Sequence, residues 1–147
     1  MKTQATIQIN ASADRVWEVF SDVEQWPSWT PSVTSLEPLD GSALAVGRRF
    51  RIKQPWLPTL VWEVTAVDAQ RGWAWTVKSP GARTTAIHDI APGGAGECLV
   101  TQVIEQHGPL GVLSGLLTRR LTRKYLDLEG QGLKAQSESV GRVASQP

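Results

Sequence analysis

The first residues of the chain alternate between apolar and polar side chains, and then the spacing of apolar residues lengthens. The alternation in Thr6–Asn10 predicts a half-buried strand. The longer spacing predicts an amphipathic helix over 13–21, which Ser12 is suited to cap, with apolar positions at Val16, Val19, Phe20 and Val23. A strand followed directly by a helix is therefore expected to begin the fold.

Two tryptophans and two prolines follow in the segment VEQWPSWTP, residues 23–31. Pro27 is suited to open a second short helix, and Pro31 biases the residue before it towards an extended conformation. The segment is therefore predicted to be a kinked passage from helix to strand. We interpret Trp26 and Trp29 as side chains that fill this corner, and Trp29 as the one that could also form part of a cavity wall.

Six further segments have the period-two pattern of strands and are separated by turn residues: 33–39, 50–54, 60–67, 72–77, 84–90 and 98–105. The gaps are short, which indicates antiparallel pairing, and the APGGAG segment at 91–96 is typical of a hairpin loop. The alternation predicts that two groups each share one face of a strand: Trp62, Val64 and Ala66, and Trp73, Trp75 and Val77.

An apolar stripe runs from Gly108-Pro109 to Gly132 and predicts one long helix of more than six turns at about 3.6 residues each. Its members are Leu110, Leu113, Leu117, Leu121, Tyr125, Leu128 and Gly132. A long antiparallel sheet curls, and this helix is the only predicted element long enough to cover its concave face. We expect a single domain over 1–137 and a frayed tail over 138–147.

Composition excludes several functions for this chain of 147 residues. Fifteen Lys and Arg against 14 Asp and Glu leave a net charge of +1, which argues against nucleic-acid binding. Cys98 is alone and there are two histidines, so we expect no disulfide, no metal site and no cofactor. The start lacks a signal-like apolar core, and the longest apolar run, 109–117, is far short of the ~20 residues that span a bilayer. These features predict a soluble, cytoplasmic protein.

Taken together, the segments resemble the SRPBCC superfamily, the helix-grip proteins that include START and pollen-allergen-like lipid carriers. Within it, the chain is similar to the bacterial polyketide cyclase/dehydrase-like branch. The likeness extends from Thr6 to Ala135, and the matching segments are Ala11–Phe20, Ser21–Pro31, Val46–Phe50, Val61–Val64 and Gly108-Pro109.

The resemblance implies an α+β helix-grip fold. Its curved antiparallel sheet of about seven strands is wrapped around a long C-terminal helix, and two short helices follow the first strand. It also implies a hydrophobic cavity between sheet and helix that takes lipids, polyketides or other apolar molecules. Some relatives are cyclases or dehydratases and many only bind and carry. No short catalytic motif marks the enzymes, so the resemblance assigns no catalytic residue here.

Eight residues are the candidates for binding the ligand: Trp29, Phe50, Trp62, Trp75, His88, Leu113, Leu117 and Leu121. If the face that carries the aromatic residues is concave, they would stack on a planar guest; the alternative is core packing against the helix. His88 is also the candidate acid or base, although structural histidines are more common. Asp89 is adjacent in sequence and would point the opposite way, so the two do not form a catalytic pair.

Three other features have both a functional and a structural interpretation. The proline-flanked loop 54–59 carries Trp56 and Leu57 and could be a lid, a membrane-touching finger or a loop folded back on the protein. One buried polar contact to a ligand could come from Glu63, Glu105 or Arg83, although an exposed position is the default. A basic cluster on the last helix could bind acidic lipid heads or a protein, or be a solvated face: Arg119, Arg120, Arg123 and Lys124.

We therefore predict binding of an apolar small molecule, namely a lipid, a polyketide or an aromatic compound. One alternative is an enzyme of the polyketide cyclase or dehydratase type that uses the same cavity. The other is a protein-interaction module that uses the basic face of the last helix. Membrane contact is a lesser expectation, and the sequence leaves the ligand's identity and the oligomeric state open.

Overall fold

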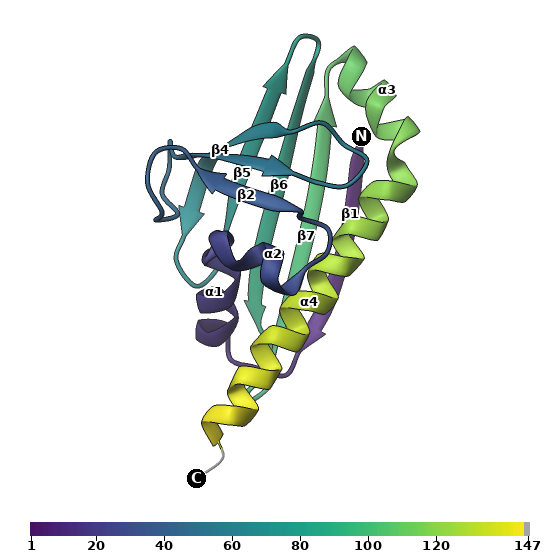
Figure 1. The fold of residues 1–147 in the computed structure, drawn as a ribbon. Coiled ribbons are helices and arrows are strands. Elements are labelled where there is room, and N and C mark those ends of the chain that lie inside the picture. Colours follow the sequence, from purple (N-terminus) through teal and green to yellow (C-terminus); the bar gives the residue numbers. More distant parts are fainter. Residues whose placement is uncertain (146–147) are drawn as a thin grey trace.

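The computed structural model describes the backbone of residues 1–145 and the side chains of residues 1–139. Seven strands and five helical segments follow one another in the predicted order, except that the predicted last helix is divided into two (Figure 1). They are β1 (Lys2–Ile9), α1 (Ala13–Ser21), the 3-10 turn η1 (Val23–Gln25), α2 (Trp26–Trp29), β2 (Ser35–Pro38), β3 (Arg49–Lys53), β4 (Leu60–Asp68), β5 (Gly72–Ser79), β6 (Ala82–Pro92), β7 (Cys98–His107), α3 (Pro109–Leu117) and α4 (Arg119–Ser145).

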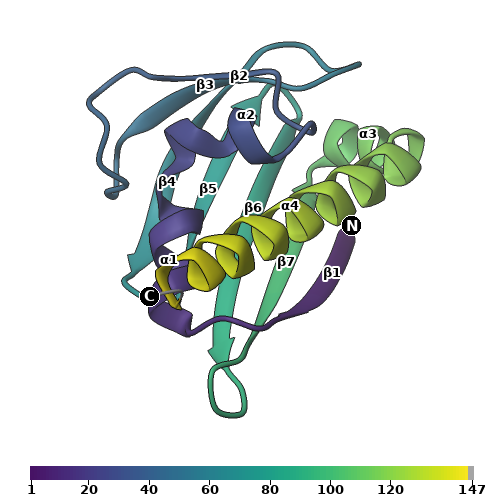
Figure 2. The same ribbon diagram turned by 60° about the horizontal axis from the view of Figure 1, so that its bottom comes forward.

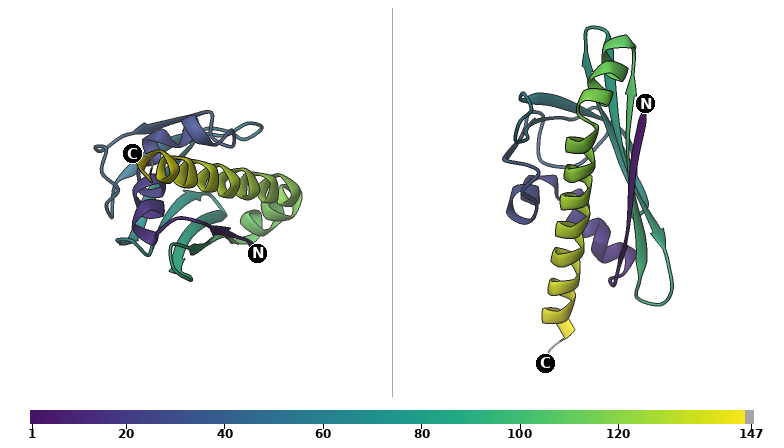
Figure 3. Two further views of the ribbon diagram at one scale, coloured as in Figure 1. Left: turned by 90° about the horizontal axis from the view of Figure 1, so that it is seen from below. Right: turned by 90° about the vertical axis from the view of Figure 1, so that its right-hand side faces the viewer.

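All seven strands belong to one antiparallel sheet with the order β1-β7-β6-β5-β4-β3-β2. Strands that follow one another in the chain are neighbours in the sheet, except that β1 pairs with β7 and not with β2. The sheet curves, and α4 lies across its concave face (Figures 2 and 3). The predicted helix-grip arrangement, with short helices after the first strand and a long helix at the end, is confirmed.

The corner between α1 and β2 is filled with aromatic side chains, as its composition predicts. The hydroxyl of Ser12 caps α1 by accepting a hydrogen bond from the backbone N–H of Arg15 at 3.2 Å. The indole N–H of Trp26 donates to the carbonyl of Phe20 at 3.0 Å, and the two rings stack 5.5 Å apart. Trp26 is therefore buried without an unsatisfied N–H, which makes it a fixed part of the core.

A bulge in β4 corrects one predicted strand face. The register between β4 and β5 shifts between Val64 and Ala66, so one extra residue stands in β4. Trp62 and Val64 are buried as predicted, but Ala66 is exposed, and Val67 packs against the core in its place. A period-two count cannot anticipate this change, because it assumes a regular pleat.

The predicted single C-terminal helix is in fact two helices, separated at Thr118. The hydroxyl of Thr118 donates to the carbonyl of Ser114 at 2.8 Å, and its backbone has φ −105° and ψ 12°. Threonine in this arrangement competes with the regular helical pattern and bends the chain. Among the described residues, no helix is both long and apolar enough to cross a membrane.

The last helix continues beyond the predicted end of the domain at 137. It is helical to Ser145, so 138–145 is not the frayed segment that the composition predicts, while residues 146 and 147 lie outside the described part of the chain. A side-chain anchor explains the difference. The carboxylate of Glu138 accepts hydrogen bonds from the backbone N–H of Asn10 at 2.9 Å and from Lys134 Nζ at 2.6 Å.

Candidate functional site: a cavity under the C-terminal helices

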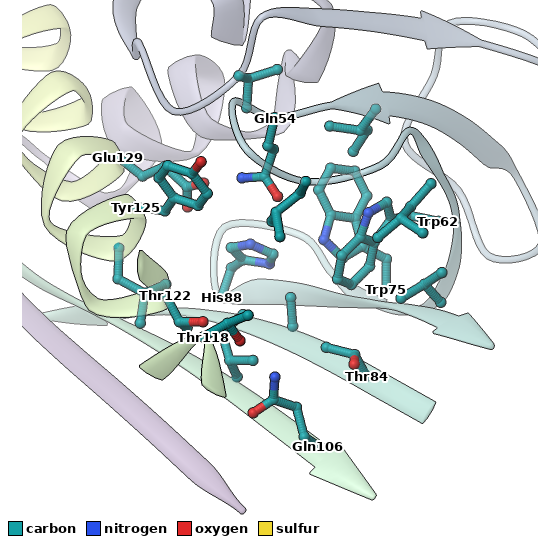
Figure 4. Close-up of a pocket in the computed structure, with 18 of the residues that line it drawn as sticks. Gln54, Trp62, Trp75, Thr84, His88, Gln106, Thr118, Thr122, Tyr125 and Glu129 are labelled. Carbon is teal, nitrogen blue, oxygen red and sulfur yellow. The ribbon is translucent and has the colours of Figure 1, made fainter. Parts of the chain in front are cut away.

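A cavity of about 160 Å³ lies between the concave face of the sheet and the segment that joins α3 to α4 (Figure 4). Strands β3 to β7, the loop after β3 and one side of α3 and α4 all contribute to its wall. An engineered protein cavity of about 150 Å³ admits benzene. The space is therefore large enough for one aromatic ring or an apolar group of similar size.

The sheet side of the cavity has an aromatic wall. The candidates Trp62 and Trp75 both line it, with their ring centroids 5.9 Å apart. Trp26 also lines it and lies 5.7 Å from Trp75. Phe50 was the other aromatic candidate, but it is fully buried behind this wall, with its ring 6.0 Å from Trp75, and does not reach the cavity.

His88 lines the cavity from β6 and is held rigidly among aromatic rings. Its imidazole stacks on Trp73 with a centroid distance of 4.1 Å and meets Phe20 edge-on at 5.2 Å, while its Nδ1 lies 3.4 Å from the Trp73 carbonyl. Burial lowers the pKa of His88 to about 3, so the ring is neutral at physiological pH. Asp89 is exposed on the opposite face, as the strand period predicts.

The helix side of the cavity carries a buried carboxyl group. Glu129 on α4 is 7% exposed, and its Oε1 accepts a hydrogen bond from the hydroxyl of Ser32 at 3.1 Å. Burial raises the pKa of Glu129 to about 7, although the bond from Ser32 acts in the opposite direction. Tyr125 and Gln54 lie beside Glu129 in Figure 4, so this end of the cavity is polar.

Sequence reasoning did not identify Glu129, although the spacing contained a signal for it. Glu129 stands four residues after Tyr125 and four before Leu133, so it shares their side of the helix. An acidic residue inside an apolar stripe is the pattern of a buried, tuned carboxyl group. The residues considered instead lie elsewhere: Glu63 and Arg83 are exposed, and Glu105 is half-exposed, 3.6 Å from His107 Nε2.

The loop after β3 is folded back against the protein and borders the cavity. Gln54 and Leu57 line the cavity, the amine of Lys53 donates to the carbonyl of Leu57, and the hydroxyl of Tyr125 donates to the carbonyl of Pro55. Trp56 at the tip points into solvent, 89% exposed, with a left-handed φ of 66°. The folded-back interpretation therefore describes the loop, with Leu57 as its contribution to the cavity.

The helix face that meets the cavity is not the predicted one. Leu113 and Leu117 are 52% and 79% exposed, and Leu121 is half-buried outside the cavity wall. The helix side of the wall is formed instead by residues on the neighbouring face of the two helices: Ser114, Thr118, Thr122, Tyr125, Leu126 and Glu129. The leucine stripe predicted a buried face, but packing against the sheet selected the neighbouring face.

Trp29 is the other candidate that the structure places outside the cavity. It is half-buried and lies against α4 at Gly132, where an added Cβ would overlap the Trp29 carbonyl oxygen. Trp26 takes the position in the wall that we predicted for Trp29. Within the described residues, no cluster of three or more His, Cys, Asp or Glu side chains could hold a metal ion.

The curved sheet, its gripped terminal helix and the small cavity between them define a helix-grip protein. The chain belongs to the family described as polyketide cyclase / dehydrase and lipid transport, whose model matches residues 1–138, and thereby to the SRPBCC superfamily. No curated protein matches the sequence. Family and fold are consistent with binding of a hydrophobic ligand or with a cyclase-type function.

Solved structures with the same fold have little sequence in common with this chain. A START superfamily protein from Mycobacterium smegmatis has a TM-score of 0.71 at 17% identity, over 95% of this chain and 98% of that one. Norcoclaurine synthase from Thalictrum flavum, in truncated form, has a TM-score of 0.74 at 17% identity, over 95% and 92%. Ara h 8.0201 has a TM-score of 0.64 at 11% identity, over 95% and 98%. At these identities the likeness describes the fold.

Proposed function

We propose that the protein binds a compact apolar small molecule, with one aromatic ring or a group of similar size, in the cavity under α3 and α4. The observation that carries the proposal is a 160 Å³ space with an aromatic wall at one side and a polar end at the other. Burial of apolar area supplies affinity at about 25 cal/mol per Å². With one cysteine, which is buried, the chain fits a reducing compartment such as the cytoplasm.

Glu129 supports a more specific ligand chemistry. Its Oε1 is engaged by Ser32, and the carboxyl group also borders the cavity, where it can meet a polar substituent of the guest. A ligand hydroxyl that donates to this carboxyl group would be fixed in orientation, with its ring against Trp62 and Trp75. We therefore propose a ligand that combines an apolar ring with one hydrogen-bond donor.

Two probes that differ by a single hydroxyl group test this chemistry: toluene and benzyl alcohol, titrated while tryptophan fluorescence is recorded. We expect both to bind, and benzyl alcohol to bind about twofold to tenfold more tightly, since one net hydrogen bond contributes roughly 0.5–1.5 kcal/mol. In Glu129→Leu this preference should disappear. Native mass spectrometry of protein purified from its own host would then weigh the natural guest.

The control for the cavity itself is a pair of substitutions on β6. Ala86 lines the cavity and Ala91 is exposed further along the same strand. Ala86→Leu fills part of the space and should weaken both probes at least tenfold, whereas Ala91→Leu should leave them unchanged. If toluene perturbs the fluorescence of wild type and Ala86→Leu equally, the cavity is not the binding site and the proposal is wrong.

The second candidate function is proton-transfer catalysis on a guest held in the same cavity. A carboxyl group with a pKa of about 7 suits an acid or base at neutral pH, and Glu129 has this value. His88, the candidate from sequence, is much too weak a base with a pKa of about 3. If the protein is a cyclase-type or dehydratase-type enzyme, Glu129 is therefore the residue that would move the proton.

Exchange of the α-hydrogens of acetophenone in D₂O, followed by NMR, tests this second function. This ketone has one ring and can enolise, so a base at Glu129 would accelerate the exchange. We expect Glu129→Gln to abolish the acceleration while toluene still binds, and His88→Asn to retain most of it. Exchange at the uncatalysed rate with wild type would leave binding as the function.

A further inference from the structure

The glycines of helix α3 pack against the rest of the protein, whereas its large apolar side chains point into solvent. Gly111 faces Ala82 of β6, and Gly115 faces Gln106 of β7, and both glycines are buried. The helix contains no charged residue. Its large side chains are between 41% and 79% exposed: Leu110, Val112, Leu113, Leu116 and Leu117. An amphipathic helix of a globular protein has the reverse arrangement.

The first two turns of α4 continue this surface with positive charge. All four residues of the basic cluster are exposed: Arg119, Arg120, Arg123 and Lys124. In the part of the chain that the structure describes, none of them takes part in an ion pair. No acidic residue occurs between His107 and Asp127, although the whole chain has a net charge of only +1. The charge is therefore concentrated beside the exposed leucines.

We propose that α3 and the basic cluster form a docking surface for an anionic lipid bilayer. Exposed leucines next to arginines match the interface of such a bilayer, where apolar side chains enter the acyl region and cations meet the lipid phosphates. Contiguous exposed apolar surface of this kind marks an interaction site. The proposal develops the membrane contact that is a lesser expectation from the sequence. It concerns the outer surface of α3 and α4, not the cavity.

Charge also argues against a second copy of the chain as the occupant. A symmetric dimer through α3 would place the same surface on both subunits, so the two basic clusters would approach each other. Like charges at close range oppose association, whereas anionic lipid supplies the complementary charge. Ser114 and Thr118 line the cavity from the inner side of the same segment. Docking would therefore bring the cavity close to the bilayer surface.

The test is flotation of the full chain with vesicles of phosphatidylcholine, with and without phosphatidylserine. We expect binding to the anionic vesicles, weakened by high salt, and little binding to phosphatidylcholine alone. Arg119→Gln with Arg120→Gln should lower the partition coefficient about thirtyfold, since each basic residue at an anionic surface contributes about fivefold. Leu113→Ser with Leu117→Ser should reduce it by at least tenfold.

Matched variants on other surfaces serve as controls. Arg51→Gln with Arg71→Gln removes two exposed positive charges elsewhere, and Leu99→Ser removes an exposed leucine from β7. Both controls should bind vesicles like wild type, and all variants should keep the wild-type melting temperature, because every substituted side chain is exposed. Wild type that does not float with anionic vesicles at low salt overturns the proposal. So does a concentration-dependent dimer that Leu113→Ser with Leu117→Ser dissociates while vesicle binding is unchanged.

Discussion

The two halves of the concave face share one sheet and helix α4 (Figure 1), yet one half is filled with side chains and the other contains the cavity. In the half covered by α1, α2 and the later turns of α4, the apolar side chains of Val16, Phe20 and Leu133 are completely buried. In the other half, α4 contributes Thr122, Tyr125 and Glu129, which leave the cavity open. We infer that the solid half supplies most of the stability and that the hollow half can hold groups that are costly to bury.

The largest expected effect is the loss of packing at Leu133, which is fully buried. Leu133→Ala leaves a void in close-packed surroundings and should lower the free energy of unfolding by about 2–5 kcal/mol. Leu113→Ala, at a half-exposed position on α3, should change it by less than about 0.5 kcal/mol. Urea denaturation measures both, and similar losses for the two variants would remove the distinction between the halves.

Next in size is the cost of the buried carboxyl group in the hollow half. The pKa of Glu129 is about 7 in the folded protein and about 4.5 when unfolded, so the folded state holds the proton more tightly. Its contribution to stability is therefore greatest below pH 4.5 and is lost as the pH rises to 7. Glu129→Gln should be about 3 kcal/mol more stable than wild type at pH 8 and similar to it at pH 4.5.

His88 makes the opposite contribution, which the same experiment reveals. Its pKa is about 3 when folded and 6.5 in an unfolded chain, so stability falls as the pH drops from 6.5 towards 3. Between pH 4.5 and 6.5 the effects of His88 and Glu129 offset each other in wild type. Urea midpoints of Glu129→Gln should therefore rise with pH in this window, while those of wild type stay nearly flat. Parallel pH profiles for the two proteins would contradict this account.

A smaller effect distinguishes two glycines of α4. A Cβ at Gly132 would overlap the Trp29 carbonyl oxygen, whereas a Cβ at Gly130 would meet Ile7 Cγ2 at an ordinary 3.5 Å. Alanine favours a helix interior over glycine by about 1 kcal/mol. Gly130→Ala should therefore raise the melting temperature, while Gly132→Ala should lower the free energy of unfolding by about 1–3 kcal/mol. If Gly132→Ala also raised the stability, the backbone of Trp29 would have to move away from the added Cβ at little cost in free energy.

The smallest effect is expected at the tip of the loop beside the cavity. Trp56 is 89% exposed and has a left-handed backbone that glycine adopts more readily. In Trp56→Gly, relief of this conformation and the greater freedom of glycine in the unfolded chain act in opposite directions. Thermal unfolding should therefore show a change within about 0.5 kcal/mol. A large loss would show that the indole stabilises the loop.

Much of the fold was predictable because periodicity reports which face of each element is buried. Strand spacing predicted that Trp62 and Val64 share one face of their strand and that Trp73 and Trp75 share one face of theirs, but it left open which face is concave; in the structure Trp62 and Trp75 line one cavity. Periodicity could not decide in this way which of two neighbouring faces of the C-terminal segment packs against the sheet. The leucine stripe was the more hydrophobic face. Gly111 and Gly115, however, have no side chains and let the helix come closer to the sheet, so the glycine face is the one that packs closely.

By itself, the sequence determined the order of the elements and the antiparallel sheet, because both depend on local spacing and composition. Only the tertiary structure decided that Trp26 and not Trp29 reaches the cavity, that Glu129 is buried beside Ser32, and that the leucines of α3 face solvent. These outcomes depend on contacts between residues that are far apart in the chain: the helical spacing of Glu129 indicates the side of α4 on which it lies, but not that Ser32 is its partner.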